Sequence, residues 1–179
     1  MEFKGLLLAG GKGTRLRPLT YTRAKQLIPI GGKPNLFYAL EDLLQAGIRD
    51  IGVILSPETG DEVRSALGDG SHWGLKLTYI VQEAPLGIAH AVACAREFVE
   101  GQPFALLFPD DVILGRRSCT AQLVAAYEAT GGTVIAVEHV ADSDVPQYGI
   151  VDPEGDGNPV RLRANGKVYT YDKRGLSTA

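Results

Sequence analysis

Short apolar runs rich in Leu, Ile, Val and Phe recur along this chain, separated by longer segments that mix polar and apolar residues. Runs of this length and composition are typical of buried strands. We predict strands over residues 3–8, 51–55, 75–81, 104–108 and 133–137. Because helix-like segments separate these strands, the pattern favours a largely parallel α/β sheet covered by helices on both faces, which makes three layers.

The segments between these runs carry apolar residues at helical spacing. Asn35 is predicted to cap a helix that ends at Gly47. The leucines that share one face of this helix are Leu36, Leu40, Leu43 and Leu44. Further helices are predicted over residues 59–67, 86–99 and 118–130. In the helix over 86–99, the residues expected to face inward are Ile88, Val92 and Val99.

Three polar segments directly follow predicted strands: the Gly-rich loop 10–13, Gln82-Glu83 and Asp110-Asp111. Parallel strands end at the same edge of a sheet, and ligands of α/β sheets bind at that edge. We therefore expect the three segments to lie close together. Carboxylate oxygens suit Mg²⁺. A pair of aspartates at a strand end is also a common turn, so both interpretations of Asp110-Asp111 stay open.

The Gly-rich loop has the composition of a phosphate-binding site. Glycines let backbone N–H groups approach an anion, and Arg15 and Lys25 supply positive charge close to them in sequence. A Walker loop needs its lysine after the last glycine, whereas Lys12 precedes Gly13. A dinucleotide-binding fingerprint needs glycine where Leu16 stands. The loop thus predicts phosphate binding outside the common ATPase and dehydrogenase patterns.

Composition narrows the class of protein. The chain has 179 residues, 45% of them hydrophobic, which suits one compact core. Its net charge of −3 and the lack of a basic block argue against a nucleic-acid partner. No apolar run is long enough to suggest a membrane partner, so we expect a cytoplasmic protein. Cys94 and Cys119 are expected to be reduced thiols, and the three histidines to be satisfied or solvated.

Two segments resemble the signature of the sugar-1-phosphate nucleotidyltransferase family. Residues 8–20 follow its pattern L-A-G-G-x-G-T-R-L-x-P-L-T, and residues 25–29 follow K-x-L-x-P. The resemblance covers about the first five-sixths of the chain. It implies an α/β/α Rossmann-like nucleotidyltransferase fold with a mostly parallel mixed sheet. It also implies transfer of a nucleotidyl group from a nucleoside triphosphate to a sugar-1-phosphate, with Mg²⁺ as cofactor and release of pyrophosphate.

The resemblance assigns roles to individual residues. Arg15 and Lys25 would be catalytic, Asp110 would bind the metal with Asp111 in support, and Tyr148 and Gly149 would lie beside the sugar. The nucleotide-binding residues would be Leu8, Ala9, Gly10, Gly11, Gly13, Thr14, Gln26, Gln82, Pro85, Gly87 and Asp110.

The resemblance indicates the nucleotide base and the sugar-binding residues less clearly than the phosphate-binding residues. Gln26 and residues 67–74 resemble glucose-1-phosphate thymidylyltransferases and favour dTTP. Residues 108–111 and 148–152 resemble bacterial enzymes that use UTP and glucose-1-phosphate, which keeps UTP as the alternative. The family's Glu-Lys-Pro motif, expected near residues 160–167, does not occur there, and the family continues past residue 179.

We therefore expect a single, C-terminally short domain over 1–179, with a nucleotide-binding part over 1–145 and a partial sugar-binding part over 146–179. A homo-oligomer is compatible with this interpretation. The alternative from another class is a nucleotide-binding regulatory or truncated module without transfer activity. A short molybdopterin-type guanylyltransferase is disfavoured, because residues 15–20 do not contain its R-M-G motif.

Overall fold

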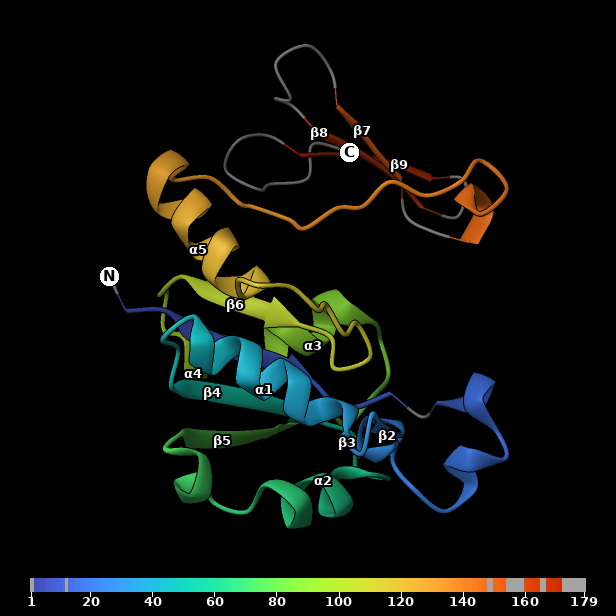
Figure 1. Ribbon diagram of the computed structural model, residues 1–179, viewed down its shortest axis with the longest axis vertical. Coiled ribbons are helices and arrows are strands. Elements are labelled where there is room, and N and C mark those ends of the chain that lie inside the picture. The colour runs from blue at the N-terminus through green and yellow to red at the C-terminus, as the bar shows by residue number, and fades with distance from the viewer. Residues whose placement is uncertain (1, 12, 148–149, 154–159, 165–166, 172–179) are drawn as a thin grey trace. The chain divides into compact units, whose positions relative to one another are not determined.

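A computed structural model describes residues 2–11, 13–147, 150–153, 160–164 and 167–171 (Figure 1). The chain divides into two compact units, Met1–Gln122 and Leu123–Ala179. Among the described residues, no helix has both the length and the apolar character needed to cross a membrane. The two units are taken one at a time below.

The first unit is built on a four-stranded sheet with the order β5-β4-β1-β6. Every neighbouring pair in this sheet is parallel. Its strands are β1 (Lys4–Leu8), β4 (Asp50–Leu55), β5 (Lys76–Val81) and β6 (Phe104–Leu107). They confirm four of the five predicted strands. Antiparallel pairing among the described residues is confined to two smaller sheets.

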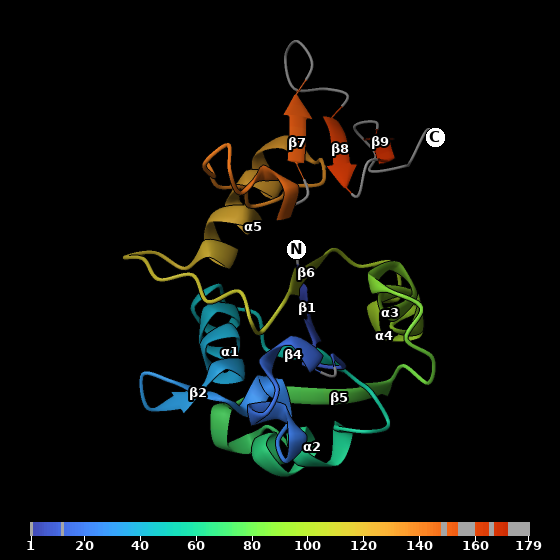
Figure 2. The same ribbon diagram turned by 90° about the vertical axis from the view of Figure 1, so that its right-hand side faces the viewer.

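Helices cover both faces of this sheet, as the side view in Figure 2 shows. The helix α1 (Asn35–Gln45) lies on one face, and α3 (Ile88–Cys94) and α4 (Arg96–Val99) lie on the other. The core on the second side consists of Leu6, Ile54, Ala91, Ala95 and Val99. On the first side, the buried leucines of α1 are Leu36, Leu40 and Leu43. The predicted three-layer arrangement is confirmed.

Two further helices agree with the sequence pattern. They are α2 (Gly60–Leu67) and α5 (Cys119–Thr130). The Asp42 carboxylate accepts hydrogen bonds from the backbone N–H groups of Cys119 and Thr120, both at 3.0 Å, and so holds the start of α5. Cys94 and Cys119 are free. Burial, and then the neighbouring Asp42 carboxylate, raise the pKa of the Cys119 thiol, which keeps that thiol protonated at neutral pH.

Short elements connect the layers. The chain between β1 and α1 forms three 3₁₀ turns and a hairpin, and a fourth 3₁₀ turn precedes β5. They are η1 (Thr14–Leu16), η2 (Leu19–Tyr21), η3 (Lys25–Leu27), the hairpin strands β2 (Pro29–Ile30) and β3 (Lys33–Pro34), and η4 (Ser71–Trp73).

Two helix predictions were wrong in detail. Asn35 does not cap α1, because Pro34 occupies the cap position and the Asn35 side chain instead donates to the backbone oxygen of Lys25. The helix predicted over 86–99 is divided at Ala95 into α3 and α4. Ile88, the first residue of α3, is 54% exposed and does not face inward, whereas Val99 is buried and Val92 packs against the core, as predicted.

The second unit contains a three-stranded antiparallel sheet in the order β7-β8-β9. Its elements are η5 (Val145–Gln147), β7 (Ile150–Pro153), β8 (Val160–Ala164) and β9 (Lys167–Tyr171). The strand predicted over 133–137 is absent from the described residues. Ile135 and Val137 remain exposed and no described strand pairs with them, so local β propensity alone did not make a strand there.

Candidate functional site

The carboxyl ends of the parallel strands bring the predicted polar segments to one edge of the sheet. The backbone N–H of Ala9 donates to the oxygen of Ile54 at 2.7 Å, and that of Gln82 donates to the oxygen of Leu55 at 2.8 Å. Both hydrogen bonds continue the sheet ladder past the strand ends. The Gly-rich loop after β1 and the Gln82 segment after β5 are therefore held by the sheet itself.

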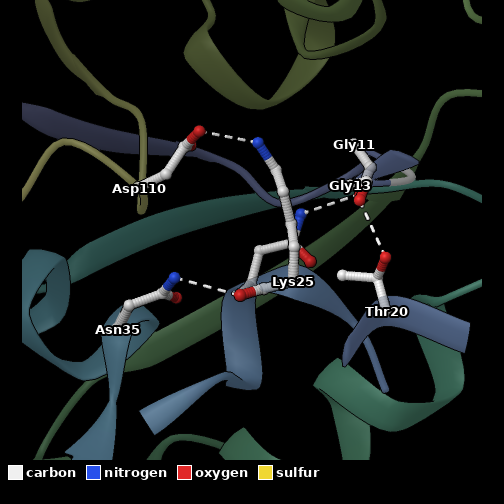
Figure 3. A network of polar contacts seen from close by, with 7 residues as sticks. Gly11, Gly13, Thr20, Lys25, Asn35 and Asp110 are labelled. Carbon is white, nitrogen blue, oxygen red and sulfur yellow. Dashed lines mark hydrogen bonds and ion pairs between the residues drawn. The ribbon is translucent and has the colours of Figure 1, made fainter. Parts of the chain in front are cut away.

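The centre of the site is an ion pair between Lys25 and Asp110 (Figure 3). Lys25 Nζ lies 2.7 Å from Asp110 Oδ2, although the two residues are 85 positions apart in sequence. The Lys25 side chain is 20% exposed and that of Asp110 is 49% exposed. The site thus joins a partly buried cation to a half-exposed carboxylate, beside a loop rich in glycine.

Neighbouring residues fix the backbone around Lys25. Asn35 Nδ2 donates to the Lys25 backbone oxygen at 3.0 Å (Figure 3). The backbone N–H of Ala24 donates to Glu62 Oε2 at 2.9 Å. Since Asn35 begins α1 and Glu62 lies in the first turn of α2, both helices hold the η3 turn that carries the lysine.

Two glycines let the loop lie directly against Lys25. A Cβ atom at Gly11 would lie 2.8 Å from Lys25 Cε, and one at Gly13 would lie 2.8 Å from Lys25 Cβ and from Thr20 Cγ2. Gly13 also adopts a left-handed conformation with φ 62° and ψ 31°. Its oxygen accepts a hydrogen bond from Thr20 Oγ1 at 2.7 Å (Figure 3). Gly13 is therefore required by its contacts with Lys25 Cβ and Thr20 Cγ2 as well as by its backbone conformation, while Gly11 leaves room for the end of the Lys25 side chain.

We expect Gly13→Ala to destabilise the fold by about 2–4 kcal/mol, the sum of the left-handed backbone cost and an overpacked contact. Gly74→Ala is the matched control, because Gly74 has nearly the same conformation, φ 65° and ψ 34°. The nearest atom to its added Cβ would be 4.0 Å away. Urea unfolding of both variants separates the two costs. Equal destabilisation of the two variants would contradict the packing contact at Gly13.

Gln26 supports the loop from inside the protein. Its side chain is buried, with 1% exposed, and its Nε2 donates to the Gly11 oxygen at 3.4 Å. Its Oε1 is buried and has no hydrogen-bond partner among the described residues. A buried acceptor without a partner costs about 1–3 kcal/mol, so this oxygen favours any ligand or water that can donate to it.

Gln82 lies at the end of β5 and its side chain is held on two sides. Its Nε2 lies 3.1 Å from the backbone oxygen of Gly87 and 3.0 Å from Nδ1 of His90. Gly87 has φ 97°, a conformation that favours glycine, and both Gly87 and Pro85 are exposed. This segment, which is predicted to bind nucleotide, therefore forms an ordered turn, and Pro85 and Gly87 of the turn are exposed to solvent.

Of the remaining residues predicted to belong to the site, some are packed against the sheet and others are exposed to solvent. Ala9 is fully buried, and a Cβ atom at Gly10 would lie 3.2 Å from the backbone nitrogen of Ser56, so the loop packs on the end of β4. Leu8 ends β1. Thr14 and Arg15 are exposed on η1, and Arg15 forms no ion pair or side-chain hydrogen bond with the described residues. Its guanidinium is therefore open to an anion.

The sugar-side prediction concerns Tyr148 and Gly149, which lie outside the described residues. They directly precede β7 of the second unit. Their predicted role beside the sugar ring stays a prediction.

Asp110 is the residue of this edge that could hold a hard cation. Its carboxylate is half exposed, and carboxylate oxygen is the donor that Mg²⁺ prefers. No group of three or more His, Cys, Asp or Glu side chains suited to a metal occurs among the described residues. A half-exposed carboxylate such as that of Asp110 fits Mg²⁺, which is commonly held by one or two carboxylates together with substrate phosphates.

Sequence reasoning missed three residues of this site. Asn35 was expected to cap a helix, Glu62 had no assigned role, and His90 was expected to be satisfied or solvated without a role. They contact Ala24, Lys25 and Gln82 through hydrogen bonds that join residues 8 to 38 positions apart in sequence. No local pattern marks such contacts. The Pro34-Asn35 pair was the one available signal, since proline at the cap position leaves the asparagine side chain for another partner.

Several known proteins are similar to this chain in sequence. The family model described as "Nucleotidyl transferase" matches residues 4–165. The low-salt glycan biosynthesis nucleotidyltransferase Agl11 of Haloferax volcanii is 44% identical over 89% of this chain and 43% of its own length. The glucose-1-phosphate thymidylyltransferase of Neisseria meningitidis is 41% identical over 98% of this chain and 64% of its own length. The chain thus spans less than two thirds of the length of each of these two relatives.

Solved structures share the fold. A UDP-glucose pyrophosphorylase complexed with UDP-glucose aligns with a TM-score of 0.79 and 24% identity, over 97% of this chain and 69% of that chain. A putative glucose-1-phosphate thymidylyltransferase from Bacillus anthracis aligns with a TM-score of 0.77 and 26% identity, over 96% and 72%. The match of the family model over residues 4–165 shows that the chain belongs to the nucleotidyl transferase family, and the curated relatives show that it is one of the sugar-1-phosphate nucleotidyltransferases.

Proposed function

We propose that the whole protein transfers a thymidylyl group from dTTP to glucose-1-phosphate, giving dTDP-glucose and pyrophosphate. The observation that carries this proposal is the Lys25–Asp110 pair beside the glycine loop. A triphosphate bound at the glycine loop would reach both the Lys25 ammonium and the Asp110 carboxylate, which is suited to binding a metal ion. The relatives named glucose-1-phosphate thymidylyltransferase support the choice of dTTP and of glucose-1-phosphate.

Both reactants are anions, so the protein's task is to bind them in line and reduce their repulsion. The loop N–H groups and the open Arg15 guanidinium would bind the β- and γ-phosphates that leave as pyrophosphate. Lys25 would pair with the α-phosphate or with the incoming sugar phosphate. A sugar phosphate oxygen then attacks the α-phosphorus as the bond to the leaving phosphates breaks.

Asp110 would hold Mg²⁺ together with phosphate oxygens, and Asp111 would support it. When bound, the ion supplies positive charge that neutralises the triphosphate. In this arrangement Lys25 exchanges part of its contact with Asp110 for contact with phosphate. Gln82 and Gly87 would face the base, and Tyr148 and Gly149 the sugar. We also infer a cytoplasmic location, because nucleoside triphosphates and sugar phosphates are available there.

Two alternatives are tied to particular observations. UTP in place of dTTP is favoured by residues 108–111, whose Phe-Pro-Asp-Asp sequence resembles enzymes that use UTP. The alternative from another class is a nucleotide-binding module without transfer activity, which would need only the Gly-rich loop, Arg15 and Gln82.

A pyrophosphate-release assay separates these functions. The protein is incubated with glucose-1-phosphate, Mg²⁺ and each of dTTP, UTP, ATP, GTP and CTP in turn. We expect release with dTTP to exceed release with any purine nucleotide by about 100-fold or more, the scale set by a site that hydrogen-bonds its substrate. Dominant release with UTP would favour the uridylyl alternative. Binding of dTTP without release would favour the module.

A further inference from the structure

His90 contacts a residue that is predicted to bind nucleotide, and among the described residues no other histidine does so. It lies in the first turns of α3, and its Nδ1 is 3.0 Å from Nε2 of Gln82. The resemblance assigns a role to Gln82 and none to His90. The contact matters because a glutamine side chain has two different ends, an acceptor oxygen and a donor nitrogen, and a half-turn exchanges them.

The backbone oxygen of Gly87 determines which end of the Gln82 amide faces inward. This oxygen accepts from Nε2 of Gln82 at 3.1 Å and from the backbone N–H of Ala91 at 3.1 Å, the latter being a helical hydrogen bond of α3. A carbonyl oxygen can only accept, so the Gln82 atom facing it must be the nitrogen. If the amide were reversed, two oxygens would face each other.

His90 takes the second hydrogen of the same nitrogen. An amide nitrogen carries two hydrogens, and the Gly87 oxygen uses one of them. The other points to Nδ1 of His90, which must therefore be an acceptor, with the ring proton on Nε2. Cys94 Sγ lies 4.0 Å from the same Nδ1, and a thiol is a weak donor, which agrees with an acceptor at that position.

With both hydrogens of Nε2 engaged, the Gln82 amide offers a ligand its oxygen alone. The hydrogen bonds of the Gln82 side chain to described residues are both made by Nε2, and none is made by Oε1. The backbone N–H of Gln82 donates to the oxygen of Leu55, so the main chain of this residue is fixed as well as its side-chain amide. An oxygen accepts from the N3–H of thymine or uracil, whereas the N3 of cytosine is itself an acceptor and repels it.

We propose that His90 is a positioning residue for base selection: it orients the Gln82 amide so that the site presents an acceptor to the N3–H of a thymine or uracil nucleotide. The inference rests on the proposed function and deepens it. His90 itself does not touch the base. Its contribution is to make the reversed amide unfavourable, because reversal would place the Gln82 oxygen against an acceptor nitrogen.

The test measures dissociation constants of dTTP and dCTP, each with Mg²⁺, for the whole protein and three variants. His90→Leu removes the acceptor nitrogen and puts an apolar side chain of similar length in its place. We expect its dTTP affinity to fall by about 3- to 10-fold, one neutral hydrogen bond, and its preference for dTTP over dCTP to fall by at least the same factor. The ratio of the two constants does not depend on how much of a sample is folded.

The other two variants keep the proposal falsifiable. Asparagine carries its side-chain oxygen as many bonds from Cα as histidine carries Nδ1, so His90→Asn should restore the preference to within about 2-fold of the wild-type value. His72→Leu is the matched control, since His72 is exposed and stacks edge-on against Trp73. It should leave the preference unchanged.

The outcomes distinguish the inference from the function beneath it. A wild-type preference for dTTP that His90→Leu leaves unchanged overturns the role of His90 and leaves the proposed function standing. So does a loss of preference that His90→Asn fails to restore. Equal affinity of the wild-type protein for dTTP and dCTP overturns both. A preference lost in His90→Leu and restored in His90→Asn supports the proposal.

Discussion

Lys25→Met is expected to lower the rate of nucleotidyl transfer by about 10²- to 10³-fold, the usual loss when a single charge-stabilising donor is removed from a reacting centre. Lys25 Nζ is the cation that contacts Asp110, at 2.7 Å. Without it, the Asp110 carboxylate loses its ion-pair partner among the described residues. The variant therefore loses an attraction for phosphate and gains a repulsion.

Lys33→Met is the control for Lys25→Met. Lys33 is also a partly exposed lysine in an ion pair, with Glu41, and its ammonium lies 4.0 Å from the centre of the Tyr38 ring. We expect this variant to keep the wild-type transfer rate within about 2-fold, because exposed ion pairs contribute little. Steady-state pyrophosphate release measures both rates, and circular dichroism checks the fold. A loss below about 3-fold for Lys25→Met would exclude the lysine from the reaction.

Arg15→Ala is expected to reduce turnover by about 10²-fold while weakening dTTP binding by less than about 10-fold. The difference follows from where charge develops. As the bond to the leaving phosphates breaks, negative charge grows on them, so a guanidinium placed there binds the transition state more strongly than the substrate. Arg15 is exposed and has no side-chain partner among the described residues, which leaves it available for this role.

Arg17→Ala provides the comparison for Arg15→Ala. Arg17 is equally exposed, two residues further on, but its guanidinium lies 5.2 Å from the centre of the Tyr21 ring. Its removal should change turnover by less than about 3-fold. Single-turnover rates and equilibrium binding of dTTP are measured on both variants. If Arg15→Ala kept near-wild-type turnover, the arginine would have no part in transfer.

The fold could be predicted where local pattern and tertiary packing agree. Apolar residues dominate the runs at β1, β4, β5 and β6, and strands of this kind are typical of a parallel sheet with both faces covered. The run over 133–137 has a similar composition but no pairing strand among the described residues, and its apolar side chains stay exposed. Pairing is a property of neighbours in space, which the run itself does not contain.

The division of the predicted helix at Ala95 has a similar origin. Between Ile88 and Val99 the sequence has no glycine or proline, so no such residue marks the break. In the structure, Ala91, Ala95 and Val99 form the buried face, and small side chains let the helices lie close to the sheet. The periodicity of larger residues also indicated Ile88, but that residue begins α3 and its side chain is 54% exposed.

The candidate site was predictable as far as its groups follow strands in sequence. The Gly-rich loop, Gln82 and Asp110 each come directly after a strand, and parallel topology then places them at one edge. The residues that hold these groups were not predictable. Asn35 and His90 act through single hydrogen bonds to partners that the fold brings near them, and such bonds leave no periodic mark in the sequence.

The central claim is that the edge formed by the Gly-rich loop, Lys25 and Gln82 binds a thymine or uracil nucleoside triphosphate. Calorimetric titration of dTTP with Mg²⁺ into the wild-type protein tests it most directly, since binding requires no sugar phosphate. We predict saturable binding at about one nucleotide per chain, weakened by about 10-fold or more in Lys25→Met and unchanged in Lys33→Met. Absence of saturable dTTP binding, or equal binding by the wild-type and Lys25→Met proteins, would contradict the account.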